Sequence, residues 1–195
     1  MMVELVNYET KWPLLYQFEK VNLQRLLKDY APKIEHIGST AVSGLSAKPI
    51  VDVMIGLKHK EDLDAVALIL ANRGYTYLQK YNEIMPYRRF FVGLKDGVIK
   101  EHYPTVITSD VNDEFLTHEK RSTHIHVTTI DSAFWKDHLL FRDCLKENGH
   151  LREQYESLKR KLSTYQWADG NDYAHAKGEF IQSILEKASV PVLGR

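Results

Sequence analysis

The hydrophobic pattern of this chain changes repeatedly between a helical period and the apolar runs of strands. Apolar residues spaced three and four apart predict amphipathic helices. Short runs rich in Val, Ile and aromatic residues predict strands, and the run 50–57 is apolar enough to be buried on both faces of a sheet. The predicted helices cover residues 12–27, 61–72, 132–147, 150–163 and 171–188, and the predicted strands cover 33–38, 50–57, 75–78, 88–92 and 124–130.

Predicted strands and helices both occur in residues 1–131, whereas the elements predicted in residues 132–195 are all helices. We therefore predict a single domain, 1–195, in which 1–131 forms a sheet with helices and 132–195 adds a C-terminal helical layer. The segment 93–121 has no clear period and is interrupted by Gly93, Gly97 and Pro104. We interpret this segment as a hairpin or long loop that is either a lid or an insertion.

Composition narrows the class of protein. With 44% apolar and 11% aromatic residues, the 195-residue chain has enough material for a sizeable core. Lys and Arg (26) balance Asp and Glu (26), which argues against a non-specific nucleic-acid or anionic-membrane surface. A single Cys144 excludes an internal disulfide framework. The longest apolar run, 65–71, is too short to span a bilayer. We expect a soluble cytoplasmic protein without a membrane partner.

The stretch 36–55 carries the clearest chemical signal. It reads as a strand ending at Gly38, a short helical turn with Ser39 and Thr40, and a second strand with a lone acid, Asp52. A glycine followed by two hydroxyl residues at such a junction leaves free backbone N–H groups, which suits a phosphate group. The alternative is an ordinary helix cap, in which Ser39 or Thr40 binds nothing.

Asp52 is a candidate metal ligand and catalytic residue. In nucleotidyl transfer, two carboxylates at positions i and i+2 of a strand share one face and hold divalent metal. Here position i+2 is Met54, and its thioether is a poor ligand for a hard cation such as magnesium. The alternative for Asp52 is a buried acid that pairs with a lysine or with backbone N–H groups.

His124 and His126 form a second candidate site. Two imidazoles at i and i+2 of a strand share a face and can begin a metal site. Together with Asp52 they would make a set of two histidines and one carboxylate, which shifts the expected metal from magnesium toward zinc, manganese or iron. Alternatively, the two rings are only hydrogen-bonded to neighbouring hydroxyls or to solvent.

Five residues are candidates for binding nucleotide phosphates or covering them. Lys48 lies between the glycine turn and Asp52, while Arg88 and Arg89 precede a strand. The planar fork of arginine and the point charge of lysine both suit phosphate. Tyr173 and Lys177 lie on the inward stripe of the last predicted helix, from which they can reach a nucleotide. The alternative for Lys177 is a packed stem with its ammonium group in water.

The same stretch resembles a family signature. The runs Glu35-His36-Ile37-Gly38-Ser39-Thr40-Ala41-Val42, Gly44-Leu45 and Ala47-Lys48-Pro49-Ile50-Val51-Asp52 are similar to the signature of the GrpB-like family, which is grouped with the nucleotidyltransferase superfamily. The resemblance continues through Arg88-Arg89-Phe90-Phe91, His124-Ile125-His126-Val127, Phe141-Arg142-Asp143, Tyr155, Leu158-Lys159, Tyr173 and Lys177, and so covers nearly the whole chain.

This resemblance implies a nucleotidyltransferase-like fold of the α/β (α+β) class, a mixed sheet flanked by helices. It implies a metal-dependent enzyme that transfers a nucleotide from a nucleoside triphosphate to a small-molecule or protein acceptor. Asp52 and His126 would hold magnesium or manganese, with zinc as an alternative. Because Met54 departs from the pattern, two other functions stay open: a nucleotide-binding module without turnover, and a metal-dependent hydrolase using Asp52, His124 and His126. A nucleic-acid acceptor is disfavoured by the balanced charge.

Overall fold

The computed structural model describes residues 2–99, 102–112, 116–168 and 170–189. Its strands are β1 (Lys33–Ile37), β2 (Val51–Leu57), β3 (Thr76–Tyr77), β4 (Arg89–Leu94) and β5 (Arg121–Thr129). Its helices are α1 (Trp12–Leu26), α2 (Asp62–Ala71), α3 (Ala133–Glu147), α4 (Gly149–Ser163), α5 (Gly170–His175) and α6 (Gly178–Ser189). Short 3₁₀ turns cover Lys28–Tyr30, Ser39–Ala41, Gln79–Tyr81 and His118–Lys120.

The five strands form one mixed sheet in the order β1-β2-β5-β4-β3. β2 and β5 are parallel neighbours, and the other three pairs are antiparallel. The return from β2 to a parallel neighbour requires a long connection, which here includes α2, β3 and β4. The mixed sheet with packed helices confirms the α/β (α+β) fold class predicted from the sequence.

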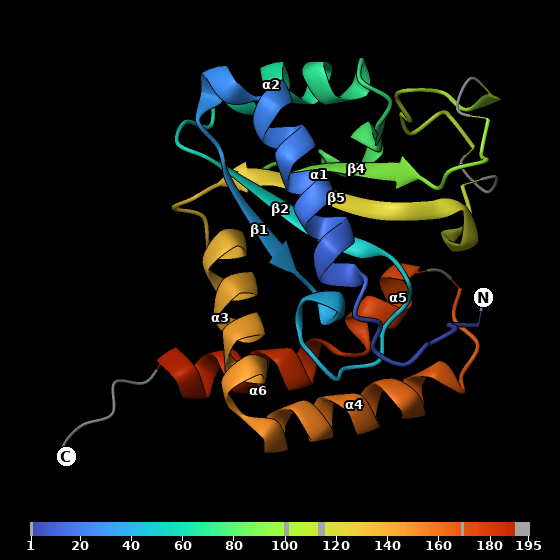
Figure 1. Ribbon diagram of the computed structural model, residues 1–195, viewed down its shortest axis with the longest axis vertical. Helices are drawn as coiled ribbons and strands as arrows, with labels where there is room; N and C mark the ends of the chain where they lie inside the picture. The colour runs from blue at the N-terminus through green and yellow to red at the C-terminus, as the bar shows by residue number, and fades with distance from the viewer. Residues whose placement is uncertain (1, 100–101, 113–115, 169, 190–195) are drawn as a thin grey trace.

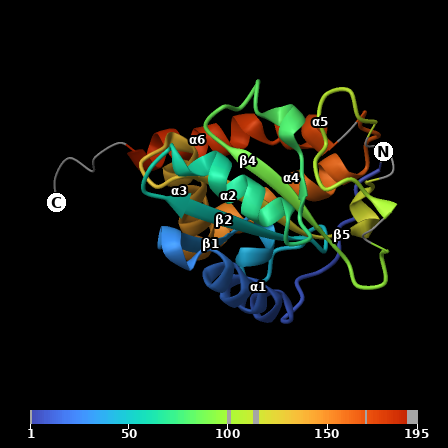
Figure 2. The same ribbon diagram turned by 90° about the horizontal axis from the view of Figure 1, so that it is seen from above.

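The helices cover the two faces of this sheet differently. On one face, here called the α1/α2 face, β2 residues such as Val53 and Ile55 pack with α1 and α2 in the largest apolar cluster. On the other face, here called the α3/α6 face, Met54 packs with Ile37 and with Trp135 of α3. Figure 1 shows α1 crossing in front of the sheet, α2 above it, and α3, α4 and α6 gathered below. Figure 2 shows α1 and the α3–α6 group on opposite sides of the strands.

Local sequence signals explain where these helices begin. Pro13 lies in the first turn of α1, where its missing N–H costs no helical hydrogen bond. The Ser132 hydroxyl caps α3 by accepting a hydrogen bond from the Trp135 N–H at 3.1 Å. Asn148 caps α4 in the same way, through the Leu151 N–H at 3.1 Å. The long C-terminal helices therefore start at residues that are strong N-caps.

Two predicted elements differ from the structure. The helix predicted over 171–188 is two helices, α5 and α6, and α6 begins at Gly178, a residue with low helical propensity. The segment 93–121 begins as the end of β4, and its described part also packs onto the sheet. Ile107 and Leu116 are buried in a cluster with Leu78 and Val92. The residues 100, 101 and 113–115 of that segment lie outside the described residues.

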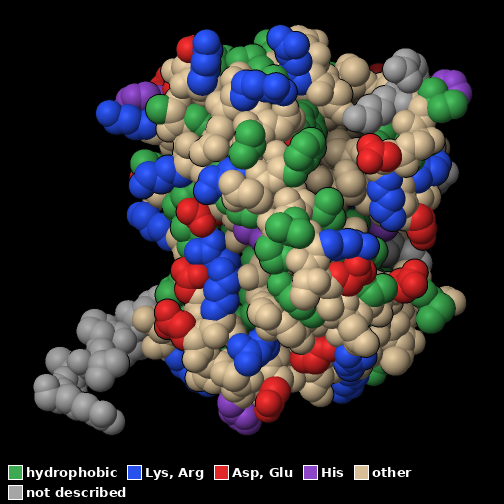
Figure 3. All heavy atoms as spheres, viewed as in Figure 1, with side chains coloured by type: hydrophobic (Ala, Val, Ile, Leu, Met, Phe, Trp, Pro, Cys, Tyr) green, Lys and Arg blue, Asp and Glu red, His purple; other side chains and the backbone are tan. Residues whose placement is uncertain are grey.

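The surface of α1 that faces away from the sheet is partly apolar. Leu14, Phe18 and Val21 are exposed there, and Phe18 retains 78% of its accessible surface. Figure 3 shows hydrophobic side chains over this helix and basic and acidic side chains interspersed around it. Across the residues with described positions, no helix combines the length and the apolar character needed to cross a membrane.

Candidate functional site

Asp52 and His124 form the centre of the candidate site. They are register partners on the parallel strands β2 and β5, so their side chains point to the same α3/α6 face. His124 Nδ1 lies 3.2 Å from Asp52 Oδ1. Their side chains keep 16% and 28% of their accessible surface, so the pair is partly shielded from water. The strand register thus joins two residues that are 72 positions apart in the sequence.

The hydrogen bonds of His124 fix its protonation state. The Asp52 carboxylate only accepts, so Nδ1 carries the hydrogen and donates it. Arg121 Nη1 lies 3.4 Å from Nε2, which identifies Nε2 as the acceptor. Burial lowers the pKa of His124 and outweighs the opposing effect of Asp52. His124 is therefore a neutral imidazole that donates from Nδ1 to Asp52 and accepts at Nε2 from Arg121.

The glycine turn is built around the same carboxylate. Gly38 has φ +69°, and a Cβ at this position would lie 2.3 Å from Asp52 Oδ2. Only glycine fits here, because a side chain would displace the carboxylate. The next residue, Ser39, begins the 3₁₀ turn after β1. The turn predicted to bind phosphate is therefore in contact with the acid predicted to work with it.

Lys159 of α4 holds this turn from the helical layer. Its side chain is 2% exposed, and Nζ donates to the Ser46 carbonyl oxygen. Nζ also lies 3.5 Å from Ser39 Oγ and 3.5 Å from the carboxylate of Glu156. Burial lowers the pKa of Lys159 to about 8, with Glu156 opposing the shift. Lys159 thus fastens the loop 39–46 to α4.

Two further lysines approach the site without an ion-pair partner. Nζ of Lys48 lies 4.9 Å from the centre of the Tyr173 ring, and Nζ of Lys177 lies 4.3 Å from the same ring. Within the described residues, neither ammonium group has a salt bridge. Burial lowers the pKa of each lysine to about 8, and Asp52 partly offsets the shift. Lys48, Lys159 and Lys177 are called the lysine cluster below.

Tyr173 adds an unsatisfied polar group at the lysine cluster. Its side chain is 4% exposed, and its hydroxyl is buried with no hydrogen-bond partner among the described residues. An orphaned buried hydroxyl costs about 1–3 kcal/mol, and such groups are rare away from functional sites. The Tyr173 hydroxyl and the ammonium groups of Lys48 and Lys177 are thus three polar groups at one place for which the described residues supply no hydrogen-bond or salt-bridge partner.

His126 lies beside this cluster but contacts Arg88 instead of Asp52. Arg88 Nη1 donates to His126 Nδ1 at 3.1 Å, so the imidazole is the acceptor. Burial first, and then the charge of Arg88, holds the pKa of His126 well below its usual value. Arg88 Nε is buried without a hydrogen-bond partner among the described residues, and its guanidinium group lies over the rings of Phe90 and Phe134.

A series of ring contacts leads from Asp52 toward α3. Phe90 lies between the two histidines of β5, with ring centroids 5.3 Å from His124 and 4.9 Å from His126. Phe134 follows at 5.7 Å from His126, and the His138 ring lies 4.0 Å from Phe134. These five rings are called the aromatic wall below. They form a continuous series of ring contacts on the α3/α6 face of the sheet.

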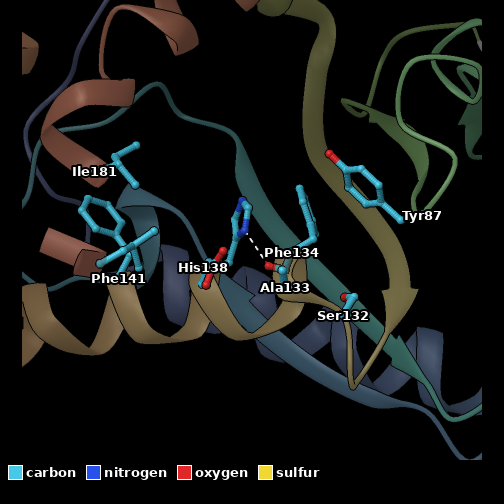
Figure 4. Close-up of a pocket in the computed structure, with 9 residues that line it drawn as sticks. Tyr87, Ser132, Ala133, Phe134, His138, Phe141 and Ile181 are labelled. Atoms are coloured by element: carbon cyan, nitrogen blue, oxygen red, sulfur yellow. Dashed lines mark hydrogen bonds between the residues drawn. The ribbon is translucent and has the colours of Figure 1, made fainter. Parts of the chain in front are cut away.

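The aromatic wall ends in a cavity of about 580 Å³ between α3, α6 and the segment before β4. Figure 4 shows Phe134, His138 and Phe141 of α3 on one side, Ile181 of α6 beyond them, and Tyr87 opposite. This volume is in the usual range for small-molecule sites. The sequence analysis did not predict the cavity, because it gave no role to Phe134, His138 or Phe141.

The structure places two predicted phosphate-binding residues away from the site. Arg89 points to the α1/α2 face, where its Nε donates to Asp64 of α2 at 2.6 Å. It differs from Arg88 because adjacent residues of a strand point to opposite faces. Thr40 is 1% exposed, and its hydroxyl lies 3.0 Å from Nε2 of His36. Their side chains already have partners elsewhere, and we no longer include them among the candidate site residues.

Asp52, His124 and His126 are not arranged to hold a metal ion together. Across the described ranges, no three His, Cys, Asp or Glu side chains gather where one ion would be held. Asp52 contacts His124, while His126 Nδ1 is occupied by Arg88. Met54 is 0% exposed and part of the apolar cluster with Trp135, so it is not directed to the site as a ligand. Metal binding remains a prediction.

The sequence analysis gave Lys159 no role in the site. The signal was present, because Lys159 follows Tyr155 by four residues and precedes Leu162 by three. It therefore lies on the buried stripe of that helix. Arg121 was missed for another reason: it lies three residues before His124 at the start of β5, in a region predicted as loop.

Comparisons with known proteins agree over almost the whole chain. A model of the GrpB protein family matches residues 2–187. The glutamate-rich protein GrpB of Alkalihalophilus pseudofirmus is 30% identical over 187 residues, 95% of this chain and 95% of that protein. The crystal structure of conserved protein GrpB from Enterococcus faecalis superposes with a TM-score of 0.71 at 27% identity, covering 95% of this chain and 96% of that one.

A more distant relative carries an enzyme name. The dephospho-CoA kinase of Mycobacterium leprae is 27% identical over 179 residues, which are 81% of this chain and 39% of that protein. The family match and the 30% identical relative each span nearly the full length of this chain. The chain therefore belongs to the GrpB family.

Proposed function

We propose that this protein binds a nucleotide through its phosphates at the lysine cluster beside Asp52 and His124. The observation that carries the proposal is an excess of positive charge at the site: two lysines for one nearby carboxylate. Lys48 and Lys177 share the Tyr173 ring, have no salt bridge among the described residues, and have Asp52 as the carboxylate that influences both. Burying two such cations is costly unless a ligand supplies negative charge.

The surrounding groups suit a chain of phosphates. The Gly38–Ser39 turn offers backbone N–H groups and a hydroxyl beside Asp52, as expected for a phosphate-binding turn. The orphaned Tyr173 hydroxyl can donate to a phosphate oxygen. Arg88, with a buried Nε that lacks a partner in the described structure, extends the positive region along the aromatic wall.

One named relative agrees with a nucleotide-related role. The Mycobacterium leprae protein is named as a kinase of dephospho-CoA, and part of it is similar to this chain. The similarity covers 39% of that protein, so its named activity is not transferred to this chain. It supports the proposal only in that a related sequence occurs within a protein named for phosphate chemistry.

Nucleotidyl transfer is the second candidate, and the Asp52–His124 pair favours it. Nδ1–H is held by the carboxylate, and the Nε2 lone pair would take the proton of an acceptor hydroxyl that replaces Arg121 as its partner. The acceptor oxygen would then form a bond to the α-phosphorus while the bridging α–β P–O bond breaks. Pyrophosphate would leave with the electron pair of that bond, and the lysine cluster would neutralise its charge.

The experiment that tests nucleotide binding is a thermal-shift panel. The four ribonucleoside triphosphates are each added with magnesium, manganese, zinc or chelator. A ligand at a hundred times its dissociation constant stabilises the native state by about 2.7 kcal/mol, so binding is readily detected. We expect stabilisation by triphosphate even with chelator present. No shift with any nucleotide under any metal condition contradicts the proposal.

Two lysine substitutions, one in the site and one outside it, test whether binding occurs at the lysine cluster. Lys48→Met removes one unpaired cation of the cluster, whereas Lys33→Met removes an exposed cation at the start of β1. We expect Lys48→Met to weaken triphosphate binding about tenfold or more, because charge-assisted contacts are the strong ones. Lys33→Met should bind as the wild type does. Release of pyrophosphate that disappears in Asp52→Asn would add transfer to binding.

A further inference from the structure

The cavity between α3 and α6 continues from the phosphate site. Lys177 immediately precedes α6, and Ile181 and Leu185 of that helix line the cavity, so this stretch of chain leads from the lysine cluster to the cavity. On the sheet, the aromatic wall makes the same connection, since His126 lies 5.7 Å from Phe134 between ring centroids. A ligand anchored at Lys177 therefore has a continuous surface leading into the cavity.

The interior of the cavity suits a flat apolar ring. Phe134, Phe141, Ile181 and Leu185 supply apolar surface, and Figure 4 shows Tyr87 opposite the α3 side chains. Stacking on aromatic side chains is the common way in which proteins bind the face of a nucleobase. The cavity volume of about 580 Å³ is ample for a base with its sugar.

His138 gives this cavity a hydrogen-bond acceptor. Its Nδ1 lies 2.7 Å from the Phe134 carbonyl oxygen, which only accepts, so Nδ1 carries the hydrogen. Burial, the largest effect, lowers the pKa of His138, so the ring is neutral and Nε2 has a free lone pair. Figure 4 shows the second ring nitrogen turned away from the α3 backbone. The carboxylate of Asp137 is another acceptor on the cavity lining.

Hydrogen-bond donors are scarce in the same cavity. The Ser132 hydroxyl already donates to the Thr129 carbonyl oxygen at 2.7 Å and accepts from the Trp135 N–H. Of the nine described lining residues, none is Lys or Arg, and Tyr87 is the one whose side-chain donor is uncommitted. A base with carbonyl oxygens would bury acceptors without donors, which is costly. A base with an amino group and no carbonyl matches this lining.

We propose that this cavity binds the adenine base of the nucleotide whose phosphates lie at the lysine cluster. Adenine presents an exocyclic amino donor to the acceptors, carries no carbonyl oxygen, and stacks its ring face against Phe134. The proposal rests on the proposed function and adds the identity of the ligand to it. Arg88, between the Phe90 and Phe134 rings, then lies where the phosphate nearest the sugar passes.

Isothermal titration with three probes separates the cavity from the phosphate site. ATP carries adenine, ITP replaces its amino group with a carbonyl oxygen, and tripolyphosphate has no base. We expect ATP to bind about tenfold or more tightly than either of the other two. Equal affinity for all three overturns adenine recognition and leaves phosphate binding standing. Absence of binding for all three overturns both.

Two variants test whether the preference for ATP over tripolyphosphate arises in the cavity. His138→Leu removes the acceptor and keeps an apolar side chain, whereas Ala133→Trp fills the cavity from an exposed position and removes no core contact. Both should lower ATP affinity to that of tripolyphosphate and leave tripolyphosphate binding unchanged. His150→Leu, at an exposed position in α4, is the matched control and should keep the ATP preference. A full ATP preference in both cavity variants contradicts the assignment.

Discussion

The two faces of the sheet differ in how completely their polar groups are satisfied. On the α1/α2 face, the apolar cluster is large and two of its polar groups are paired: Arg89 with Asp64, and the Tyr75 hydroxyl with Glu19 and Asn22. An exception is Asn82, which donates to the Tyr77 hydroxyl but whose buried Oδ1 has no partner among the described residues. On the α3/α6 face, the apolar clusters are smaller, and the groups between them include the unpaired Lys48 and Lys177. In our proposal, the α1/α2 face stabilises the fold and the α3/α6 face binds the ligand.

Strand β2 contributes to both faces through its alternation. Val51, Val53 and Ile55 belong to the large cluster, while Asp52 points the opposite way. A fold can keep costly groups such as buried lysines on one face when the other face supplies enough apolar burial. The comparison predicts that changes on the α1/α2 face alter stability, whereas changes on the α3/α6 face alter binding.

The largest effect is expected from truncating the α1/α2 face. Ile55→Ala at a fully buried position should lower the free energy of unfolding by about 2–5 kcal/mol, because it removes buried methyl groups and leaves a cavity. The ATP affinity of the folded protein should not change. Urea denaturation and titration measure the two quantities separately. A loss of affinity without a loss of stability would contradict the division between the faces.

The opposite pattern is expected for Lys177→Met. The substitution should weaken triphosphate binding roughly ten- to a hundredfold, because a desolvated charge-assisted contact is lost. It should raise the stability of the ligand-free protein at pH 7, since a buried cation without a salt bridge in the described structure is replaced by an apolar side chain. Lys161→Met, on the exposed side of α4, is the control. A destabilised Lys177→Met variant would show that this lysine is part of the structural core.

Changing the pH tests the same lysines without substitution. Burial lowers the pKa of Lys48 and Lys177 from 10.5 to about 8. Between these values the unfolded chain holds more protons than the folded one, so the stability of the ligand-free protein should rise as pH increases from about 8 to 10. Phosphate affinity should fall over the same range, because the lysines lose their charge. Affinity independent of pH between 7 and 9.5 would exclude them from the binding site.

Sequence alone selected several residues of the candidate site. The residue types at a strand junction singled out Gly38, Ser39 and Asp52, and the structure places Gly38 against the Asp52 carboxylate. The spacing of the last predicted helix singled out Lys177, which the structure places just before α6, and the binding role of these residues stays a prediction. Arg142 and Asp143, adjacent in the Phe141-Arg142-Asp143 run, form an ion pair, with Nε 2.7 Å from Oδ1. These features depend on local spacing, which a sequence displays directly.

The remaining features depend on which strands are neighbours and which face a residue occupies. Asp52 meets His124 only because β2 pairs with β5 in this register. The sequence does not fix which of Arg88 and Arg89 points to which face of β4, because a shift of one residue exchanges the two faces. Both arginines were therefore predicted to bind phosphate. The cavity combines α3 with α6, whose packing cannot be read from either helix alone.

The smallest change with a clear outcome removes the exposed ion pair of the α1/α2 face. Arg89→Gln breaks the contact with Asp64, whose side chain is 75% exposed, so the loss of stability should be about 1 kcal/mol or less. A larger loss, measured by urea denaturation, would mean that Arg89 supports the core and does more than pair at the surface.

The neighbouring arginines also supply the most direct test of the central claim, that ligand phosphates bind on the α3/α6 face. ATP is titrated calorimetrically into the wild type, Arg88→Gln and Arg89→Gln. The two variants carry the same substitution one residue apart on opposite faces of β4 and its approach. We predict about tenfold weaker binding for Arg88→Gln and unchanged binding for Arg89→Gln. Equal affinities in both variants, or a loss confined to Arg89→Gln, would contradict the account.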